Sequence, residues 1–261
     1  MIKYEAVAAG VQKVLAPNPG PMTLEGTNTW VIGDPVRVAP IIVDPGPLDE
    51  DHLERVLEVA GGRAGAIWLT HRHHDHSDGA GRMAELAGCQ VMAADPAYAS
   101  DQDCELEDGY RIDLAGLELR AVTTPGHTSD STSFLISGRH RSALLITGDM
   151  VLGRGTTVIT HPDGDLAAYF DSLQTMITIV DDQRVAEILP GHGDRIADPA
   201  RVLAFYREHR LERLDQVRAA LDSGAQNAMD VVKIVYADVD RSVWPAAEQS
   251  VRAQLDYLKQ H

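Results

Sequence analysis

Short apolar runs and amphipathic stretches alternate along the first two hundred residues. Compact runs such as Ala66–Leu69 and Leu144–Ile146, each followed by a turn, predict buried strands. The same reasoning predicts strands at Val11–Leu15, Thr27–Ile32, Ile41–Val43, Leu117–Val122 and Ile188–Leu189, the first two of these forming a hairpin. Apolar residues three or four positions apart predict helices at Asp49–Ala60, Gly79–Ala87 and Asp165–Val180. Strands in two groups, each followed by helices, predict two sheets packed face to face with helices outside.

The last sixty residues have a purely helical pattern. Helices are predicted at Pro199–Leu221, Met229–Tyr236 and Pro245–Leu258, the last of which opens with a proline in its first turn. This change of character divides the chain into an α+β domain over residues 1–197 and a small helical domain over residues 198–261.

Composition and charge narrow the class of protein. An apolar content of 44% is that of an ordinary globular protein. No run approaches the roughly 18 apolar residues of a membrane span, and Met1–Glu5 lacks the features of a secretory signal. We expect a cytoplasmic protein with Cys89 and Cys104 as reduced thiols and no membrane partner. The formal charge of −16 disfavours non-specific binding to nucleic acid.

The densest group of chemically active side chains follows the predicted strand at Ala66–Leu69. His71 and His73 alternate, and Asp75 and His76 come directly after them. Imidazole and carboxylate groups suit zinc, and the alternation offers the first pair to one metal and the second pair to another. His74 lies between these residues and is expected to point away. A solvated polar loop would need only one or two such residues, so the stretch predicts a metal site.

Two metals need more than four protein ligands, and three other predicted strands end at candidates. His127 follows Leu117–Val122 within a Pro-Gly-His turn, whereas Asp149 and His192 each follow a glycine after their strands. Glycine at such turns lets backbone and metal approach closely.

Together these motifs resemble the metallo-β-lactamase-fold hydrolases over nearly the whole chain. The resemblance implies an α+β fold, a four-layer αββα sandwich. It also implies two Zn²⁺ ions per chain, with Fe or Mn as alternative metals. The ligands it implies are His71, His73 and His127 for the first metal, Asp75, His76 and His192 for the second, and Asp149 as a bridge between them.

Asp44, directly after Ile41–Val43, matches the first motif of that family and is implied to be a supporting residue. A carboxylate there can accept the free ring N–H of a ligating histidine or secure the neighbouring turn. Three further histidines are weaker candidates. His52 is expected to be solvated on the polar side of its helix, and His140 and His161 lie in polar turns from which contact with substrate is the less favoured outcome.

A long loop rich in Pro and Gly lies between the first two strands, at residues 17–26. The motif Asn-Pro-Gly-Pro in this loop, together with Leu-Glu-Gly-Thr-Asn-Thr at its end, resembles the β-lactamase-like protein 2 family. In that family the loop overhangs the metals. By that resemblance Thr27 and Asn28 are substrate-side candidates; the alternative is that they only hold the turn. Arg154 lies in a Gly-rich segment after Asp149. It either binds an anionic group in the cleft or belongs to a loop that only connects two elements.

The three C-terminal helices resemble the winged-helix appendage of the same subgroup. Such a domain either reads nucleic acid or walls the active-site cleft. The helix over Arg201–Arg218 is mildly basic, but acidic residues outnumber basic ones beyond it. A nucleic-acid reader normally needs a positive stripe, so we favour the wall.

The resemblance implies a hydrolase. Metals lower the pKa of bound water to ~7, and the hydroxide held between them attacks the substrate. Asp75 would orient this hydroxide and Asp149 would keep the metals together. The subgroup contains an endoribonuclease and thioesterases that act on carrier-bound acyl chains. The expected partner is therefore single-stranded RNA, a carrier-bound acyl chain or a small molecule, and a homodimer is one of the oligomeric states that the sequence allows.

Two other functions fit these residues less well. Di-iron redox proteins of this fold carry glutamate where this chain has His73, and they add a flavin domain that is absent here. A binding protein whose metals only stabilise the fold would not need seven ligands at an open loop face, because an open coordination position serves catalysis.

Overall fold

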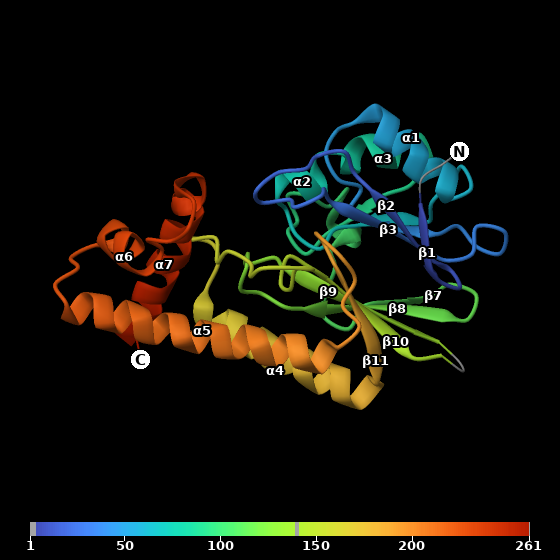
Figure 1. The fold of residues 1–261 in the computed structure, drawn as a ribbon. Helices are drawn as coiled ribbons and strands as arrows, with labels where there is room; N and C mark the ends of the chain where they lie inside the picture. Colours follow the sequence, from blue (N-terminus) through green and yellow to red (C-terminus); the bar gives the residue numbers. More distant parts are fainter. Residues whose placement is uncertain (1–3, 139–140, 261) are drawn as a thin grey trace.

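The computed structural model describes residues 4–138 and 141–260, which form two facing sheets (Figure 1). The first sheet runs in the order β1 (Glu5–Ala8), β2 (Val11–Leu15), β3 (Asn28–Ile32), β4 (Ile41–Val43), β5 (Ala66–Trp68) and β6 (Val91–Met92). The second runs in the order β11 (Val185–Pro190), β10 (Ala143–Gly148), β9 (Thr132–Gly138), β8 (Leu117–Thr123) and β7 (Arg111–Asp113). The predicted hairpin is present, with Val11 opposite Ile32 and Leu15 opposite Asn28.

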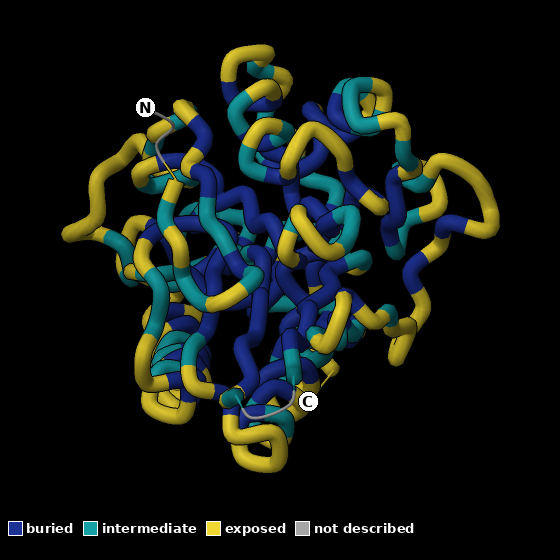
Figure 2. The backbone as a smooth tube through the Cα atoms, turned by 90° about the vertical axis from the view of Figure 1, so that its right-hand side faces the viewer, coloured by how far each residue is buried: buried dark blue, intermediate teal, exposed yellow. Residues whose placement is uncertain are grey.

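The central strands are apolar on both faces because each sheet is covered on both sides. In β3, Trp30 and Ile32 point into the core between the sheets, whereas Val31 packs under the outer helices. In β10, Ile146 points inward and Leu145 outward in the same way. Successive side chains of a strand alternate between faces, so continuous apolar runs are what a four-layer arrangement requires. Figure 2 shows the buried segments running through the centre of the molecule.

Helices form the two outer layers (Figure 1). On the first sheet lie α1 (Glu50–Val59) and α3 (Ala80–Ala87), and on the second lie α4 (Leu166–Gln183) and the first half of α5 (Pro199–Asp222). Asp49 and Asp165 cap α1 and α4 by accepting backbone N–H groups, which is why those helices begin where the apolar periodicity does. The predicted αββα sandwich is confirmed.

His52 corrects one expectation: it is fully buried, not solvated. Its Nε2 lies 3.0 Å from the Thr29 hydroxyl. Position 52 precedes Val56 by one helical turn, so it borders the apolar stripe of α1, and the strand beneath supplies a polar partner. Burial, with a smaller contribution from Arg55, lowers the pKa of His52 to about 4.

The three predicted C-terminal helices are present, and the first of them, α5, belongs to two cores. Its first half places Leu203 and Tyr206 against α4 and the second sheet. Its second half joins α6 (Ala228–Val235) and α7 (Trp244–Gln260) in a separate apolar cluster around Val217. A domain boundary at residues 197/198 stays a prediction, because α5 is shared.

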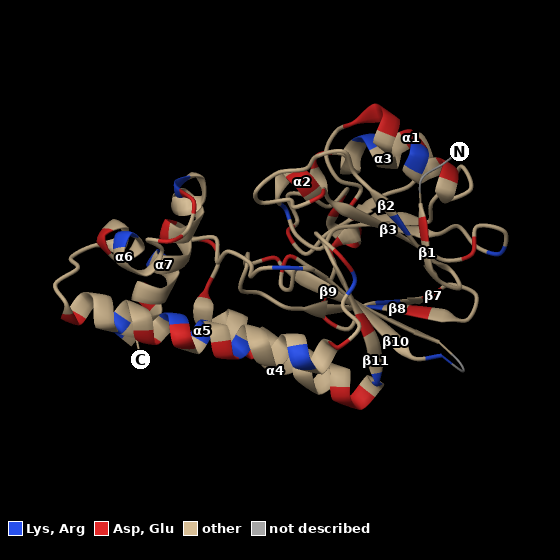
Figure 3. Ribbon diagram, viewed as in Figure 1, with Lys and Arg blue, Asp and Glu red and all other residues tan. Residues whose placement is uncertain are grey.

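Charges on these helices are interspersed (Figure 3). In α6 and α7, Lys233, Arg252 and Lys259 are each ion-paired with an acidic residue one turn away. They form no continuous positive stripe. None of the helices in the described ranges combines the length and the apolar character of a membrane span. Cys89 and Cys104 are not bonded to each other.

Candidate metal centre and its cleft

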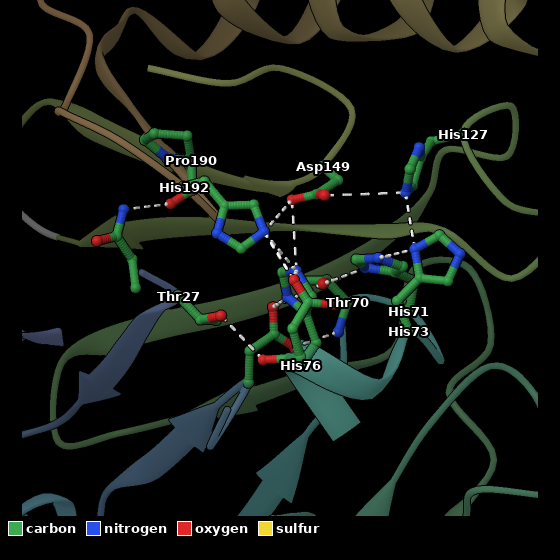
Figure 4. Close-up of polar contacts among 12 residues, drawn as sticks. Thr27, Thr70, His71, His73, His76, His127, Asp149, Pro190 and His192 are labelled. Atoms are coloured by element: carbon green, nitrogen blue, oxygen red, sulfur yellow. Dashed lines mark hydrogen bonds and ion pairs between the residues drawn. The ribbon is translucent and has the colours of Figure 1, made fainter. Parts of the chain in front are cut away.

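Four segments that follow β5, β8, β10 and β11 bring the seven predicted ligands together. Figure 4 labels these residues except Asp75. The short helix α2 (His74–Ser77) turns Asp75 and His76 inward after β5. The ligand atoms form three groups, each within 4.8 Å: His71, His73 and His127; His71, His76 and Asp149; Asp75, His76 and His192.

In the first group three imidazole nitrogens face one another. His71 Nε2 and His127 Nε2 each lie 3.0 Å from His73 Nδ1. The Nδ1 atom of His127 lies 2.6 Å from the carbonyl oxygen of Val158, so this nitrogen donates and its Nε2 presents a lone pair. One proton on His73 cannot satisfy both neighbouring nitrogens. The three converging nitrogens therefore fit a cation of the kind that histidines bind.

The group of Asp75, His76 and His192, called the second group from here on, also has converging imidazole nitrogens and adds a carboxylate. His76 Nδ1 lies 2.8 Å from Asp44 Oδ2, and His192 Nδ1 lies 3.1 Å from the carbonyl oxygen of Gly26. Their Nε2 atoms are 3.2 Å apart, and Asp75 Oδ2 lies 3.1 Å from that of His192. Two nitrogens and a carboxylate oxygen directed at one point make a donor set for a divalent cation.

Asp149 lies between the two groups. Its Oδ1 atom is 3.4 Å from the Nε2 atoms of both His76 and His192, and its Oδ2 is 3.9 Å from His127 Nε2. Oδ1 is buried and has no hydrogen-bond partner among the described residues. Buried carboxylate oxygens are normally paired, so this one fits a position that bridges two cations.

Electrostatics differ between the two groups. Burial lowers the pKa of His71 well below its ordinary value and that of His73 to about 4, and neighbouring imidazoles add to the effect. Burial acts the same way on His192, but Asp149 and Asp75 outweigh it and raise the pKa to about 9. Carboxylates likewise raise the pKa of His76 well above its ordinary value. The first group is therefore a set of neutral imidazoles, whereas the second attracts positive charge.

Asp44 supports both groups. Its Oδ1 accepts the Thr70 backbone N–H at 2.8 Å, and its Oδ2 accepts the Thr70 hydroxyl at 2.6 Å as well as facing His76. Thr70 Oγ1 lies 3.0 Å from His71 Nδ1. One carboxylate thus orients a histidine in each group, directly for His76 and through Thr70 for His71. Both roles suggested for Asp44 occur together, and Thr70 is a supporting residue that sequence reasoning missed.

Close backbone approach explains one glycine at the site. A Cβ atom on Gly191 would lie 2.7 Å from Asp149 Oδ1 and 2.8 Å from His76 Cε1. The side chain of any other residue before His192 would enter the space between the two groups. The Gly-His motif predicted this close approach of the backbone.

Thr27 and Asn28 lie behind the site rather than on the cleft lining. Thr27 donates its hydroxyl to the Asp75 carbonyl at 2.9 Å, and its backbone N–H reaches Asn18 Oδ1 at 2.9 Å. Asn28 donates its amide to the carbonyls of Pro190 and Gly193 at 3.0 and 2.8 Å. Both side chains are buried. The structure corrects their substrate-side interpretation and favours the alternative, in which they hold the turns that carry Asp75 and His192.

A cleft of about 490 Å³ opens beside the candidate ligands. His73, Asp75, His127 and Asp149 line it, and so does Pro21 of the 17–26 loop. The other lining residues are Met22, Val158, Thr160, Ser242, Val243, Pro245, Ala246 and Gln249. The C-terminal helices therefore wall the cleft.

The remaining candidates lie apart from the ligands. His74 points away, as expected, and pairs with Asp78 at 2.9 Å. His161 pairs with Asp256 on α7 at 3.1 Å and does not line the cleft, and His140 lies outside the described residues. Arg154 pairs with Glu25, and both side chains are exposed.

Comparisons with known proteins identify the family of both parts of the chain. Residues 22–192 match the family model described as the metallo-beta-lactamase superfamily, and residues 228–261 match the beta-lactamase associated winged helix domain. A beta-lactamase-like protein 2 homolog of Drosophila melanogaster is 32% identical, covering 97% of this chain and 89% of that protein. An atrochrysone carboxyl ACP thioesterase of Aspergillus chevalieri is 32% identical, covering 95% and 77%.

A solved structure has the same fold. A metallo-beta-lactamase family protein from Thermus thermophilus superposes with a TM-score of 0.81 at 20% identity, covering 98% of this chain and 95% of that one. At this identity the similarity concerns the fold alone.

Proposed function

Because the chain belongs to the metallo-beta-lactamase superfamily, we propose that it is a binuclear zinc-dependent hydrolase whose substrate is an acyl thioester, carried on a carrier molecule. The observation that carries the proposal is Asp149, at the base of an open cleft: its buried Oδ1 faces the Nε2 atoms of His76 and His192 at 3.4 Å but has no hydrogen bond among the described residues. A site that only stabilised the fold would be closed by its own ligands, whereas a catalytic site keeps access to substrate.

The ligand residues divide the work of holding two cations. The first position is offered by His71, His73 and His127, the second by Asp75, His76 and His192, and Asp149 reaches both. Two such cations would lower the pKa of water to ~7 and polarise the substrate carbonyl. All-histidine donors at the first position favour zinc.

Asp75 has the clearest second role. Its side chain is 29% exposed and lines the cleft, so it is accessible to an attacking water. His76 and His192 outweigh the effect of burial and lower the pKa of Asp75 to about 2, so the carboxylate is ionised at neutral pH. An ionised carboxylate accepts a hydrogen bond from the water and orients its lone pair toward the substrate.

The cleft walls favour an acyl substrate over RNA. Apolar side chains of Pro21, Met22 and Val243 lie above the ligand residues, where an acyl chain can pack. Proteins that bind single strands stack bases on aromatic rings. No Phe, Tyr or Trp is among the described residues that line this cleft, and Tyr236, which lines the adjoining cavity, already has the Arg213 guanidinium against its ring. The charge of −16 also repels a polyanion. The thioesterase named among the relatives supports the same choice.

The proposal is tested by metal analysis and by two substrates measured side by side. We expect about two zinc ions per chain, release of free thiol from a butyryl thioester of N-acetylcysteamine, and loss of this activity after chelation. A single-stranded oligoribonucleotide should remain intact under the same conditions. Cleavage of the oligonucleotide without thioester hydrolysis would reverse the choice of substrate, and active protein with only trace metal would end the proposal.

A further inference from the structure

A second cavity of about 320 Å³ continues from the candidate metal centre toward α5. His127 and Asp149 lie at one end of it, and His209, Arg210 and Arg213 lie along α5. Apolar side chains form much of the remaining wall: Met22, Leu24, Leu152, Val239 and Val243. The cavity therefore joins the reactive end of the site to a group of basic residues through an apolar passage.

Arg210 is the unusual residue of this cavity. It is only 3% exposed, yet no carboxylate in the described parts of the chain forms an ion pair with it. Its guanidinium donates to the Thr157 carbonyl and lies 5.0 Å above the Tyr169 ring, while Nε has no hydrogen-bond partner. These neutral contacts position the side chain but leave its charge uncompensated. A buried charge without a counter-ion is costly.

Arg213, one turn further along α5, repeats the pattern. Its guanidinium lies 4.6 Å from the centre of the Tyr236 ring and donates to Gln216 Oε1 at 2.7 Å and to the Val235 carbonyl at 3.3 Å. Its Nε is buried and unpaired, and it too has no ion pair within the described ranges.

His209 completes the basic group without adding a charge. Burial, followed by the nearby Arg210 and Arg213, lowers the pKa of His209 to about 4, so the imidazole is neutral at neutral pH. Its Nδ1 atom is buried without a hydrogen-bond partner. A neutral ring nitrogen next to two guanidinium groups can donate or accept a hydrogen bond from a ligand.

Arg210 is the one buried arginine among the described residues, and several less buried arginines of this acidic chain do have a carboxylate partner. Ion pairs with Asp or Glu hold Arg72, Arg82, Arg195, Arg218 and Arg252, and even the exposed Arg154 at the edge of the cavity is paired with Glu25. With 39 acidic and 23 basic residues, carboxylates are abundant. Two unpaired guanidinium groups lining one cavity therefore point to an anion that comes from outside the chain.

We propose that this cavity binds an anionic group, a carboxylate or a phosphate, at the far end of a substrate whose scissile bond lies at the metal centre. Arg210 and Arg213 supply the charge, His209 supplies a further hydrogen bond, and the apolar passage holds the body between the two ends. This inference rests on the proposed hydrolase function, because it takes the metal centre as the place where the scissile bond of the same substrate lies. The substrate class is thus an acyl thioester with an apolar body and one oxyanion, on either the acyl group or the carrier.

Binding of small non-hydrolysable probes tests the anion site directly. Calorimetry would compare 4-phenylbutyrate, 4-phenylbutylphosphonate as a stable stand-in for a phosphate, and neutral 4-phenylbutyramide on the metal-containing protein and its variants. Charge-assisted hydrogen bonds predict that at least one anion binds about tenfold more tightly than the amide. Arg213→Gln should bring this ratio close to one while the amide binds as before. Arg210→Lys, which retains the charge, should keep most of the preference.

Arg207→Gln is the matched control, because it removes the same charge from an exposed position of α5 that does not line the cavity. Its anion preference should equal that of the parent. An unchanged ratio in Arg213→Gln, or an equal loss in Arg207→Gln, would overturn the proposal. Tighter binding of the phosphonate would place the anion on the carrier, and tighter binding of the carboxylate would place it on the acyl group. Since binding is measured without turnover, failure of thioester hydrolysis would count against the hydrolase and not against this site.

Discussion

The two ends of the substrate site are built in different ways. At the metal centre, the ligand-bearing segments are held by strand ends and by hydrogen bonds that involve Asp44, Thr70 and Asn28, all of them buried. At the other end, the cavity is walled by α5, the C-terminal helices and the 17–26 loop. At the metal centre each side chain depends on hydrogen bonds with its neighbours, so one change affects several ligands. At the other end, single residues of the cavity wall can change without disturbing the ligands. We expect changes at the first end to affect chemistry, and changes at the second to affect which substrate is accepted.

The largest effect is expected from Asp75→Asn, which keeps the size of the side chain but removes its charge. Hydrolysis should fall by roughly 10²-fold or more, the scale of losing a positioned acid or base. The melting temperature should change little, since His71, His73 and His127 still hold the first position. Steady-state kinetics and thermal unfolding, measured on the same preparation, check this. Parental rates with two metals bound would show that Asp75 is only structural.

Single histidine changes should separate the two positions of the metal centre. His127→Ala should weaken metal binding at the first, and His192→Ala at the second, each leaving about one ion per chain. Elemental analysis after dialysis would check the stoichiometry. Loss of both ions in either variant would show that the two positions are not independent.

Thr70→Val tests the support under the first group. The variant keeps the shape but removes the hydroxyl between Asp44 and His71. Metal affinity should fall by about 10-fold to 100-fold, as is usual when a residue that orients a metal ligand is lost. Competition with a chromophoric chelator measures this affinity. Thr128→Val, which removes a buried hydroxyl bonded to Ser131 at 2.7 Å and not to a candidate ligand, is the control and should leave the affinity unchanged.

Ala246→Trp tests the other end, where α7 contributes to both cavities. A large ring there should fill the passage and lower turnover of a long-chain thioester by about tenfold, while an acetyl thioester is affected less. Metal content should stay that of the parent. Equal losses for short and long substrates would mean that this wall does not select chain length.

The smallest effect concerns His52, which lies behind β3. Its pKa is about 4 in the folded protein, below the ordinary 6.5, so the unfolded chain binds more protons below pH 6.5. Stability should therefore decrease as pH falls through this window, by about 1 kcal/mol from pH 6.5 to 5.5. Denaturant unfolding of the parent and of His52→Gln should differ by this slope. Parallel pH profiles would contradict the assignment.

Regular elements and candidate ligands could largely be predicted, because both depend on local patterns. The strand ends that carry His71, Asp149 and His192 are marked by apolar runs followed by ligand-capable residues within a few positions. Short or mixed strands give no such signal: β9 (Thr132–Gly138) is not among the predicted strands, although it lies at the centre of the second sheet. Its polar residues Thr132 and Ser133 are buried, and Ser133 Oγ finds its partner, the Thr124 hydroxyl at 2.9 Å, on another segment.

The sequence by itself determined the αββα architecture and a set of seven metal-ligand candidates, since periodicity and motif spacing act over a few residues. Tertiary structure alone decided the roles of residues whose partners are distant in the chain. Asn28 bonds to Pro190, and Arg210 to Thr157, across 162 and 53 positions. Whether such a side chain faces substrate, supports a turn or stays unpaired depends on which groups folding places beside it.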